Sequence, residues 1–278
     1  MIGRDVYPGG ARVHGGRYRA VVLSSRPLLA AAAAVAAAAT FALPAAASAQ
    51  IEDSETPEVC RQENMRCPDL RMGAPSELYL QRTPGGRTLL RSRNRLRNRG
   101  AGPLSLHSRR DRDERSMRVR QRIYRTNASH ITRFTHARLD FWHIPGQGGY
   151  WKVRNPVEFQ LWTMGSGREL VRDGEKSRFC MRDLVRRTDA GPRRAVFPAC
   201  SQDRSDRTNR QGISVGWDES YPAGYFEQYV DVSGLRGCFK LWHVADPNNR
   251  FFESDETNNA AGTIVGLRNG RLRVGRCS

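Results

Sequence analysis

The stretch MRVRQRIYR, residues 117–125, decides the fold class. Its apolar and basic side chains alternate with period two, which is typical of a β-strand that buries one face and exposes the other. Aromatic and β-branched runs follow at 157–164 (VEFQLWTM), 225–233 (YFEQYVDVS) and 238–245 (CFKLWHVA). Such runs also favour strands.

Turn residues separate these strands. LYLQR (78–82) and RTLLRSRNRLR (87–97) flank the turn TPGG, and residues 262–274 predict a hairpin about Asn269-Gly270. Residues 184–211 have no periodicity and predict a long irregular loop. No long stretch shows a 3.6-residue period. We therefore predict an all-β fold, an antiparallel β-sandwich with long irregular loops and disulfide bonds.

The first 49 residues have the pattern of an export signal. Basic residues precede an apolar, Ala-rich run at 28–43, and Ala47-Ser48-Ala49 is a small-residue cleavage site. The alternative is a membrane anchor, but a run of about 16 residues is short for a spanning helix. We expect residues 50–66 to be a polar linker and 67–278 to be the β domain. The protein would then be exported, extracellular or in the cell envelope, with no transmembrane helix after cleavage.

Six cysteines are consistent with an oxidising compartment, because an even number in an exported chain favours disulfides. Without a Cys-x-x-Cys motif, zinc and thioredoxin chemistry are not indicated. Fifteen pairings are possible for six cysteines. The short loops favour two pairs and leave a third: Cys60–Cys67, Cys180–Cys200 and Cys238–Cys277.

The chain is strongly basic, with 46 Lys and Arg against 28 Asp and Glu. Residues 1–49 contain five Arg and one Asp, so the remainder carries a net charge of +14. Five arginines alternate along one predicted strand face, which favours either a polyanion site or a solvated face. Residues 81–123 contain no aromatic side chain to stack on bases, so we expect no specific nucleic-acid binding. Attraction to an acidic surface or polymer is expected either way. The five alternating arginines of the predicted strand face are Arg91, Arg93, Arg95, Arg97 and Arg99.

GISVG, residues 212–216, matches the G-x-S-x-G pattern of serine hydrolases. That motif needs a helix after the serine, and Pro222 and Gly224 block one here. His243 with Asp231 or Asp246 would complete a triad, but not in the chain order of such hydrolases. The sequence therefore disfavours serine hydrolysis.

FFESDETNN, residues 251–259, includes the carboxylates of Glu253 and Asp255 and the amides of Asn258 and Asn259 in one short segment. Hard oxygen ligands at this density suit Ca²⁺. PDL at 68–70 would add a carboxylate and a main-chain carbonyl. Taken alone, an acidic turn is more often a solvated loop.

The chain from Cys67 to about Leu267 resembles bacterial members of the lysyl oxidase family. The resemblance lies in the order of CPDL, GGRTLLRSRNRLRNRGAGPL, QRIY, GEKSRFCMRD, QGISVGWDESY, YVDVSG and ESDETNN. It implies a copper enzyme that oxidises primary amines, such as peptidyl lysine, to aldehydes and releases hydrogen peroxide. It also implies a lysine tyrosylquinone cofactor made from the chain's own Lys and Tyr.

Lys176 and Tyr221 stand at the positions of that cofactor pair. Only three of the 46 basic residues are Lys, and an amine can add to an oxidised tyrosine ring where a guanidinium cannot. A structural alternative is a buried ion pair of Lys176 with Asp218 or Glu219 and a core role for Tyr221.

The resemblance further implies a calcium site that ties the start of the domain to its end. Its ligands would be the side chain of Asp69, the carbonyl of Leu70 and the side chains of Glu253, Asp255, Asn258 and Asn259.

One motif of the family is missing. The family's His-x-His-x-His copper motif corresponds to GQGGYWKV, residues 146–153, where the ligand positions are Gly148, Tyr150 and Lys152. Imidazole suits copper, whereas Gly has no side chain and an ammonium repels a dication. His130, His136 and His143 do not reproduce the spacing.

Two functions from different classes therefore stand. The first, which we favour, is a calcium-stabilised, non-catalytic family member that binds an envelope or extracellular partner. The second is an active amine oxidase that uses Lys176 and Tyr221 with an altered metal site.

Overall fold

The computed structural model describes residues 58–277, which are all-β apart from one short 3-10 helix. The expected export signal and the first part of the expected linker lie outside these residues. The described part of that linker contains the 3-10 helix and the first strand. The elements are η1 (Glu58–Arg61), β1 (Met65–Arg66), β2 (Leu70–Met72), β3 (Ser76–Arg82), β4 (Thr88–Asn98), β5 (Leu104–Arg109), β6 (Ser116–Arg125), β7 (His130–Ile144), β8 (Gly148–Arg154), β9 (Val157–Thr163), β10 (Leu170–Asp173), β11 (Arg178–Phe179), β12 (Val185–Arg186), β13 (Thr208–Ile213), β14 (Trp217–Tyr221), β15 (Tyr229–Asp231), β16 (Gly237–Ala245), β17 (Ala260–Arg268) and β18 (Arg271–Val274).

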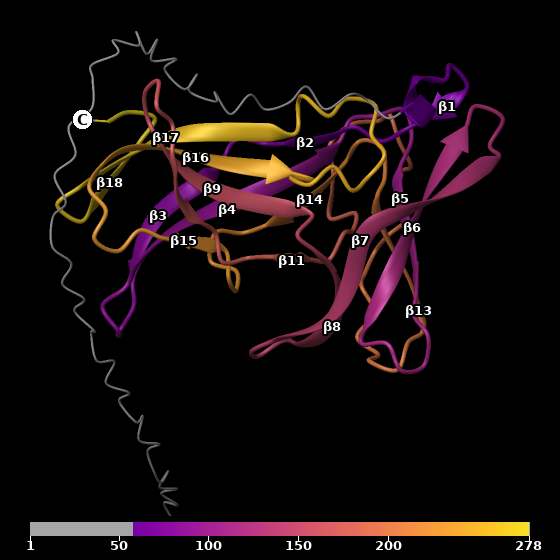
Figure 1. The fold of residues 1–278 in the computed structure, drawn as a ribbon, viewed down its shortest axis with the longest axis horizontal. Helices are drawn as coiled ribbons and strands as arrows, with labels where there is room; N and C mark the ends of the chain where they lie inside the picture. The colour runs from indigo at the N-terminus through magenta and orange to yellow at the C-terminus, as the bar shows by residue number, and fades with distance from the viewer. Residues whose placement is uncertain (1–57, 278) are drawn as a thin grey trace, which may run out of the picture. The chain divides into compact units, whose positions relative to one another are not determined.

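The strands form three antiparallel sheets (Figure 1). The first has the order β11-β8-β7-β6-β5-β13, with β1 also paired to β6. The second has the order β10-β9-β16-β17-β18, and the third has the order β12-β14-β4-β15, with β2 and β3 also on β4. The prediction of an antiparallel all-β fold is confirmed, and the expected turn at Asn269-Gly270 joins β17 to β18.

The period-two stretch forms β6 as predicted. Met117, Val119 and Ile123 are fully buried, while Arg118 and Arg120 between them are exposed. One hydrophobic core joins all three sheets, because it contains Met117, Leu161 of β9 and Leu96 of β4. Burial of this apolar surface is the main force that holds the sheets together.

The arginine-rich strand is β4, and its guanidiniums are partly occupied by the protein itself. The arginines at 91, 93, 95 and 97 are half-buried. Arg93 pairs with Glu77 at 2.7 Å, and Arg91 donates to the carbonyl of Tyr225 at 2.7 Å. Arg99 lies beyond the end of the strand and is exposed. These internal partners favour a structural role for the strand over a dedicated polyanion site.

The three disulfides join the same cysteines that the loop lengths favour: Cys60–Cys67, Cys180–Cys200 and Cys238–Cys277. The second joins Cys200, inside the predicted long loop, to Cys180, which precedes that loop. Strands β12 and β13 lie at the beginning and the end of the loop. Within residues 58–277 we find no helix of the length and apolarity that crossing a membrane requires.

The side chain of Asp183 also holds the long loop of residues 184–211 in place. Its carboxylate is buried and accepts four hydrogen bonds, from the N–H groups of Val196, Phe197 and Ser214 and from the Ser214 hydroxyl, at 2.7–3.2 Å. Ser214 is the serine of GISVG. Its hydroxyl is buried and bound to a carboxylate rather than to a histidine, so the motif has a structural role.

Candidate functional site

The structure brings Lys176 and Tyr221 together. Lys176 lies between β10 and β11, and Tyr221 ends β14. The Lys176 Nζ is 4.3 Å from the centre of the Tyr221 ring, and both side chains are buried. The pair that the family resemblance indicates is therefore in contact.

Aromatic rings surround the Lys176 ammonium on several sides. Its Nζ lies 4.6 Å from the Phe179 ring centre and 4.7 Å from that of Tyr225, and it donates to the carbonyl of Arg178 at 3.1 Å. Burial, together with the nearby charge of Lys152, lowers the Lys176 pKa to about 7, while the charge of Glu219 opposes this shift. A neutral amine, which is the nucleophilic form, is thus accessible near neutral pH.

Glu219 is the buried acid of this site. It lies two residues before Tyr221 on β14 and is fully buried. Burial raises the Glu219 pKa to about 7, against the opposing charges of Lys176 and Arg182. Glu219 and Asp218 were both considered as ion-pair partners of Lys176. The charge of Glu219 favours the protonated form of Lys176, whereas Asp218 pairs with Arg187 at 3.0 Å.

The Tyr221 hydroxyl is held in its protonated form. It accepts a hydrogen bond from the N–H of Cys180 at 3.1 Å. Burial raises the Tyr221 pKa, and the charge of Glu219 raises it further. The Tyr225 ring packs against the Tyr221 ring at 4.6 Å, and its own hydroxyl bonds the Gln147 side chain at 3.0 Å. Tyr225 is only half-buried, so it lies on the solvent side of the pair.

The three positions that the resemblance aligns with the family's copper ligands, Gly148, Tyr150 and Lys152, lie on β8, next to this pair. Lys152 is buried, with its Nζ 5.9 Å from the Tyr221 ring centre and 5.6 Å from that of Tyr225. Burial lowers the Lys152 pKa to about 8. The Tyr150 hydroxyl donates to the carbonyl of Gln147 at 3.1 Å. Gly148 has a φ of +92°, a backbone conformation in which a side chain would be strained.

These residues do not fit a copper ion. The three positions supply one ammonium, one phenol already bonded to the backbone and no third side chain. His130, His136 and His143 are exposed on β7. Across residues 58–277, the structure brings no three-ligand group of His, Cys, Asp or Glu together except an acidic one elsewhere. An ammonium near the ring also repels a dication.

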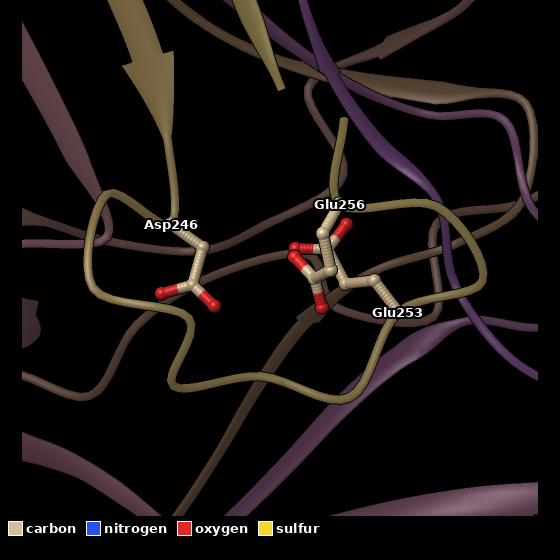
Figure 2. Close-up of side chains that lie close together, drawn as sticks. All are labelled: Asp246, Glu253 and Glu256. Atoms are coloured by element: carbon tan, nitrogen blue, oxygen red, sulfur yellow. The ribbon is translucent and has the colours of Figure 1, made fainter. Parts of the chain in front are cut away.

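That acidic group lies in the segment before β17. Asp246, Glu253 and Glu256 are buried and point toward one another (Figure 2), with ligand oxygens that all lie within 4.8 Å. Glu253 belongs to the calcium set that the resemblance implies. Asp246 and Glu256 were not predicted as ligands. The only signal for Glu256 was its position inside the acidic segment, and Asp246 was considered only as part of a hydrolase triad.

The other residues of the expected calcium set are placed around Glu253. The Glu253 carboxylate accepts the N–H of Leu70 at 2.6 Å, which ties the start of the domain to its end. Asp69 is buried and accepts Arg71 at 2.6 Å, while its second oxygen has no partner. Asn258 donates to Asp255, and its own amide oxygen lacks a partner. The unpartnered oxygens are hard donors of the kind that calcium prefers, so the residues fit that ion.

Asn98 explains why Asp69 and Leu70 reach this position. The buried Asn98 amide accepts the N–H groups of Asp69 and Gly100 and donates to the carbonyls of Gly102 and Ile213. A Cβ atom at Gly102 would lie 2.0 Å from the Arg66 carbonyl oxygen, so only glycine allows this approach. The end of β4 thus holds the segment before β2 in place.

The described residues thus form a disulfide-bonded, antiparallel all-β domain that contains a buried Lys–Tyr pair and a cluster of buried carboxylates. The family model described as lysyl oxidase matches residues 81–277. The chain therefore belongs to the lysyl oxidase family. A comparison with curated proteins finds no match.

Proposed function

We propose that this chain is an exported, calcium-stabilised member of the lysyl oxidase family that does not oxidise amines and instead binds an acidic partner in the envelope or outside the cell. The observation that carries the proposal is the buried Lys152 ammonium at a former copper position, 5.9 Å from the Tyr221 ring centre. A lysine at that position, in place of a histidine, leaves no set of imidazoles for copper.

The proposal of an acidic partner rests on the positive net charge of the chain and on one open cavity. The cavity has a volume of about 630 Å³ and contains six arginines against three acidic residues. Arg178 lies 4.1 Å over the Trp142 ring and Arg110 lies 5.0 Å over the Trp151 ring, so planar cations are held against aromatic faces. Such a surface suits carboxylated or sulfated polymers. It is lined by Arg110, Arg112, Asp113, Glu114, Arg115, Asp140, Phe141, Trp142, Trp151, Arg154, Arg178 and Arg204.

A second function is supported by a different observation. Lys176 and Tyr221 are in contact at 4.3 Å, which is what an amine oxidase with a cofactor built from this pair would need. In that case a metal would have to be bound by residues other than those on β8.

Binding to heparin, used as a sulfated probe polymer, tests the proposed partner class. We expect saturable binding that weakens as salt rises, because the attraction is electrostatic. The variant Arg112→Ala/Arg204→Ala should bind about tenfold more weakly, which corresponds to about 1.4 kcal/mol. Both arginines are exposed at the cavity, so the fold should be unaffected.

The matched control is Arg271→Ala/Arg273→Ala, which changes two exposed arginines of β18 outside the cavity. It removes the same two charges and should leave the affinity nearly unchanged. Equal weakening in both variants would mean that net charge alone attracts the polymer and that the cavity is not a site. Peroxide release on adding primary amines would instead support the oxidase.

A further inference from the structure

One face of the first sheet carries arginines that no acidic side chain pairs with. It spans β13, β5, β6 and β7, which are neighbours in that order (Figure 1). Four of these arginines are exposed and one, Arg122, is half-buried. Within residues 58–277, none of the five forms a salt bridge. We call this surface the sheet face, and its arginines are Arg109, Arg120, Arg122, Arg138 and Arg210.

The pairing register shows that these side chains share one side of the sheet. Residues directly opposite one another in an antiparallel pair point to the same side. Arg120 of β6 lies opposite His107 of β5 and Phe134 of β7, and His107 lies opposite Arg210 of β13. Arg122 is two residues from Arg120 on β6, so it points the same way. Three strand spacings make this row about 14 Å wide.

The neighbouring row contains two more of these arginines. Arg118 of β6 lies opposite Arg109 of β5 and Arg138 of β7. Asp111 and Glu114 neutralise Arg118, at 2.8 and 3.6 Å. Arg109 and Arg138 have no such partner among the described residues, and like charges directly opposite one another destabilise a sheet. A bound anion would relieve that repulsion.

Acidic side chains are nearly absent from the four strands. β5, β6 and β13 contain none, and β7 contains only Asp140. The Asp140 carboxylate is already bound by Arg154 at 2.7 Å and Arg178 at 3.2 Å. Burial and the charges of Arg122 and Arg210 lower the pKa of His107 to about 4. The sheet face therefore carries uncompensated positive charge, which attracts polyanions.

The sheet face also contains an open aromatic ring. Phe134 is 63% exposed, the highest value for a large hydrophobic side chain in the part of the chain that the structure describes. The Arg120 guanidinium lies 4.1 Å from the centre of the Phe134 ring. The bases of a single strand stack on such rings, and arginine adds a cation–π contribution. The arginine-rich residues 81–123 contain no aromatic side chain, and the fold supplies one from β7.

We propose that the sheet face binds single-stranded nucleic acid without sequence preference, with phosphates on the arginines and a base on Phe134. Positive charge combined with aromatic stacking is how proteins bind single strands of any sequence. A duplex fits less well, because a row about 14 Å wide exceeds the major groove, which is about 12 Å wide. A sulfated polymer would use the arginines but offers no base to the ring.

The proposal is independent of the cavity in the proposed function. None of the five arginines of the sheet face lines that cavity. Binding without sequence preference also agrees with the expectation of no specific nucleic-acid recognition. Each of the two surfaces can therefore fail its test while the other passes.

Fluorescence anisotropy of a labelled oligothymidylate tests the sheet face, with the disulfide-intact protein as the titrant. A length of about 15 nucleotides covers the site sizes of single-strand binders. Phe134→Ala should bind about tenfold more weakly, because the stacking contact is lost. Phe134→Trp should bind at least as tightly as the wild type, because it keeps a ring on which a base stacks.

Arg109→Ala/Arg138→Ala tests the phosphate contacts. We expect about tenfold weaker binding and a shallower salt dependence, because each phosphate contact to a single strand contributes about 0.7 to the slope of log K against log salt. The slope should therefore fall by about 1.4. The unfolding temperature should not fall, since both side chains are exposed and lie opposite a like charge.

Two other arginine pairs are the matched controls, each removing two exposed positive charges. Arg271→Ala/Arg273→Ala lies on β18, and Arg112→Ala/Arg204→Ala lies at the cavity. Both should bind the oligonucleotide nearly as the wild type does. Equal weakening in all three arginine pairs would overturn the proposal, because net charge alone would then attract the strand. Weakening in the cavity pair alone would also overturn it and would assign the strand to the cavity.

The remaining outcomes concern the wild type and the ring. A wild type without saturable binding of the oligonucleotide would refute the proposal. So would a Phe134→Ala variant with wild-type affinity, because no base would then stack on the ring. If the Arg109→Ala/Arg138→Ala variant also lost heparin binding in that case, the occupant of the sheet face would be a sulfated polymer instead.

Discussion

Replacing Asp183 with alanine is expected to lower the free energy of unfolding by about 4 kcal/mol. The carboxylate accepts four hydrogen bonds, and hydrogen bonds to a charged group contribute about 1.5–3 kcal/mol each when their partners are then left buried and unpaired. Partial access of water to the loop reduces the sum. Denaturant unfolding of the disulfide-intact protein measures the change.

Asp189→Ala is the matched control, because it removes a carboxylate from the same loop. The Asp189 side chain is 95% exposed and makes one ion pair, with Arg186, so its loss should change stability by less than about 1 kcal/mol. If the two variants lost the same stability, the account of how the long loop is held would be wrong.

Acid sensitivity of the fold is expected to depend on His243. This fully buried residue of β16 bonds the Ser92 hydroxyl at 3.0 Å and packs on Phe159, and burial lowers the His243 pKa from 6.5 to about 3. Between these values the unfolded chain binds a proton that the native protein does not. Stability therefore falls as pH drops from 6.5 to 3, by about 1.4 kcal/mol per pH unit.

The measurement compares unfolding free energies of the wild type and His243→Gln from pH 7 to pH 4. The wild type should lose about 3 kcal/mol more than the variant over this range. His130→Gln is the control, because His130 is exposed and its substitution should leave the pH profile parallel to that of the wild type. Parallel profiles for His243→Gln as well would contradict the assignment.

The strands could be predicted from the sequence because one buried face leaves a period-two pattern. MRVRQRIYR became β6 with its apolar positions buried, and Asn269-Gly270 became a hairpin turn. The division into three sheets could not be predicted, since side-chain alternation does not say which strands pair. The ion pairs of the β4 arginines could not be predicted either, because Glu77 and Asp218 are brought next to these arginines only when the chain folds.

The candidate site was predicted through resemblance rather than through pattern. Lys176 and Tyr221 are 45 positions apart in the chain, and only the fold shows that they touch. The approach of Asp246 to Glu253 was not predicted either, because the two residues are separated in the chain by the turn that brings them together. The burial of Lys152 was also unforeseen, since a lysine is rarely fully buried without a partner.

The position of Lys152 decides how we interpret the relationship of this chain to the copper enzymes of the family. Its ammonium lies among Tyr150, Tyr221 and Tyr225, within 6.0 Å of each ring centre. The Lys–Tyr contact is retained, while the adjacent positions carry a side chain that repels metals. The central claim is therefore that Lys176 and Tyr221 persist as ordinary side chains.

Peptide mapping by mass spectrometry of the protein, produced with copper present, tests that claim most directly. We expect the peptides that contain Lys176 and Tyr221 to be recovered separately and unmodified, with no copper bound to the protein. A crosslinked species that joins the two peptides, with the mass change of quinone formation, would contradict the account and establish that metal chemistry persists in this chain.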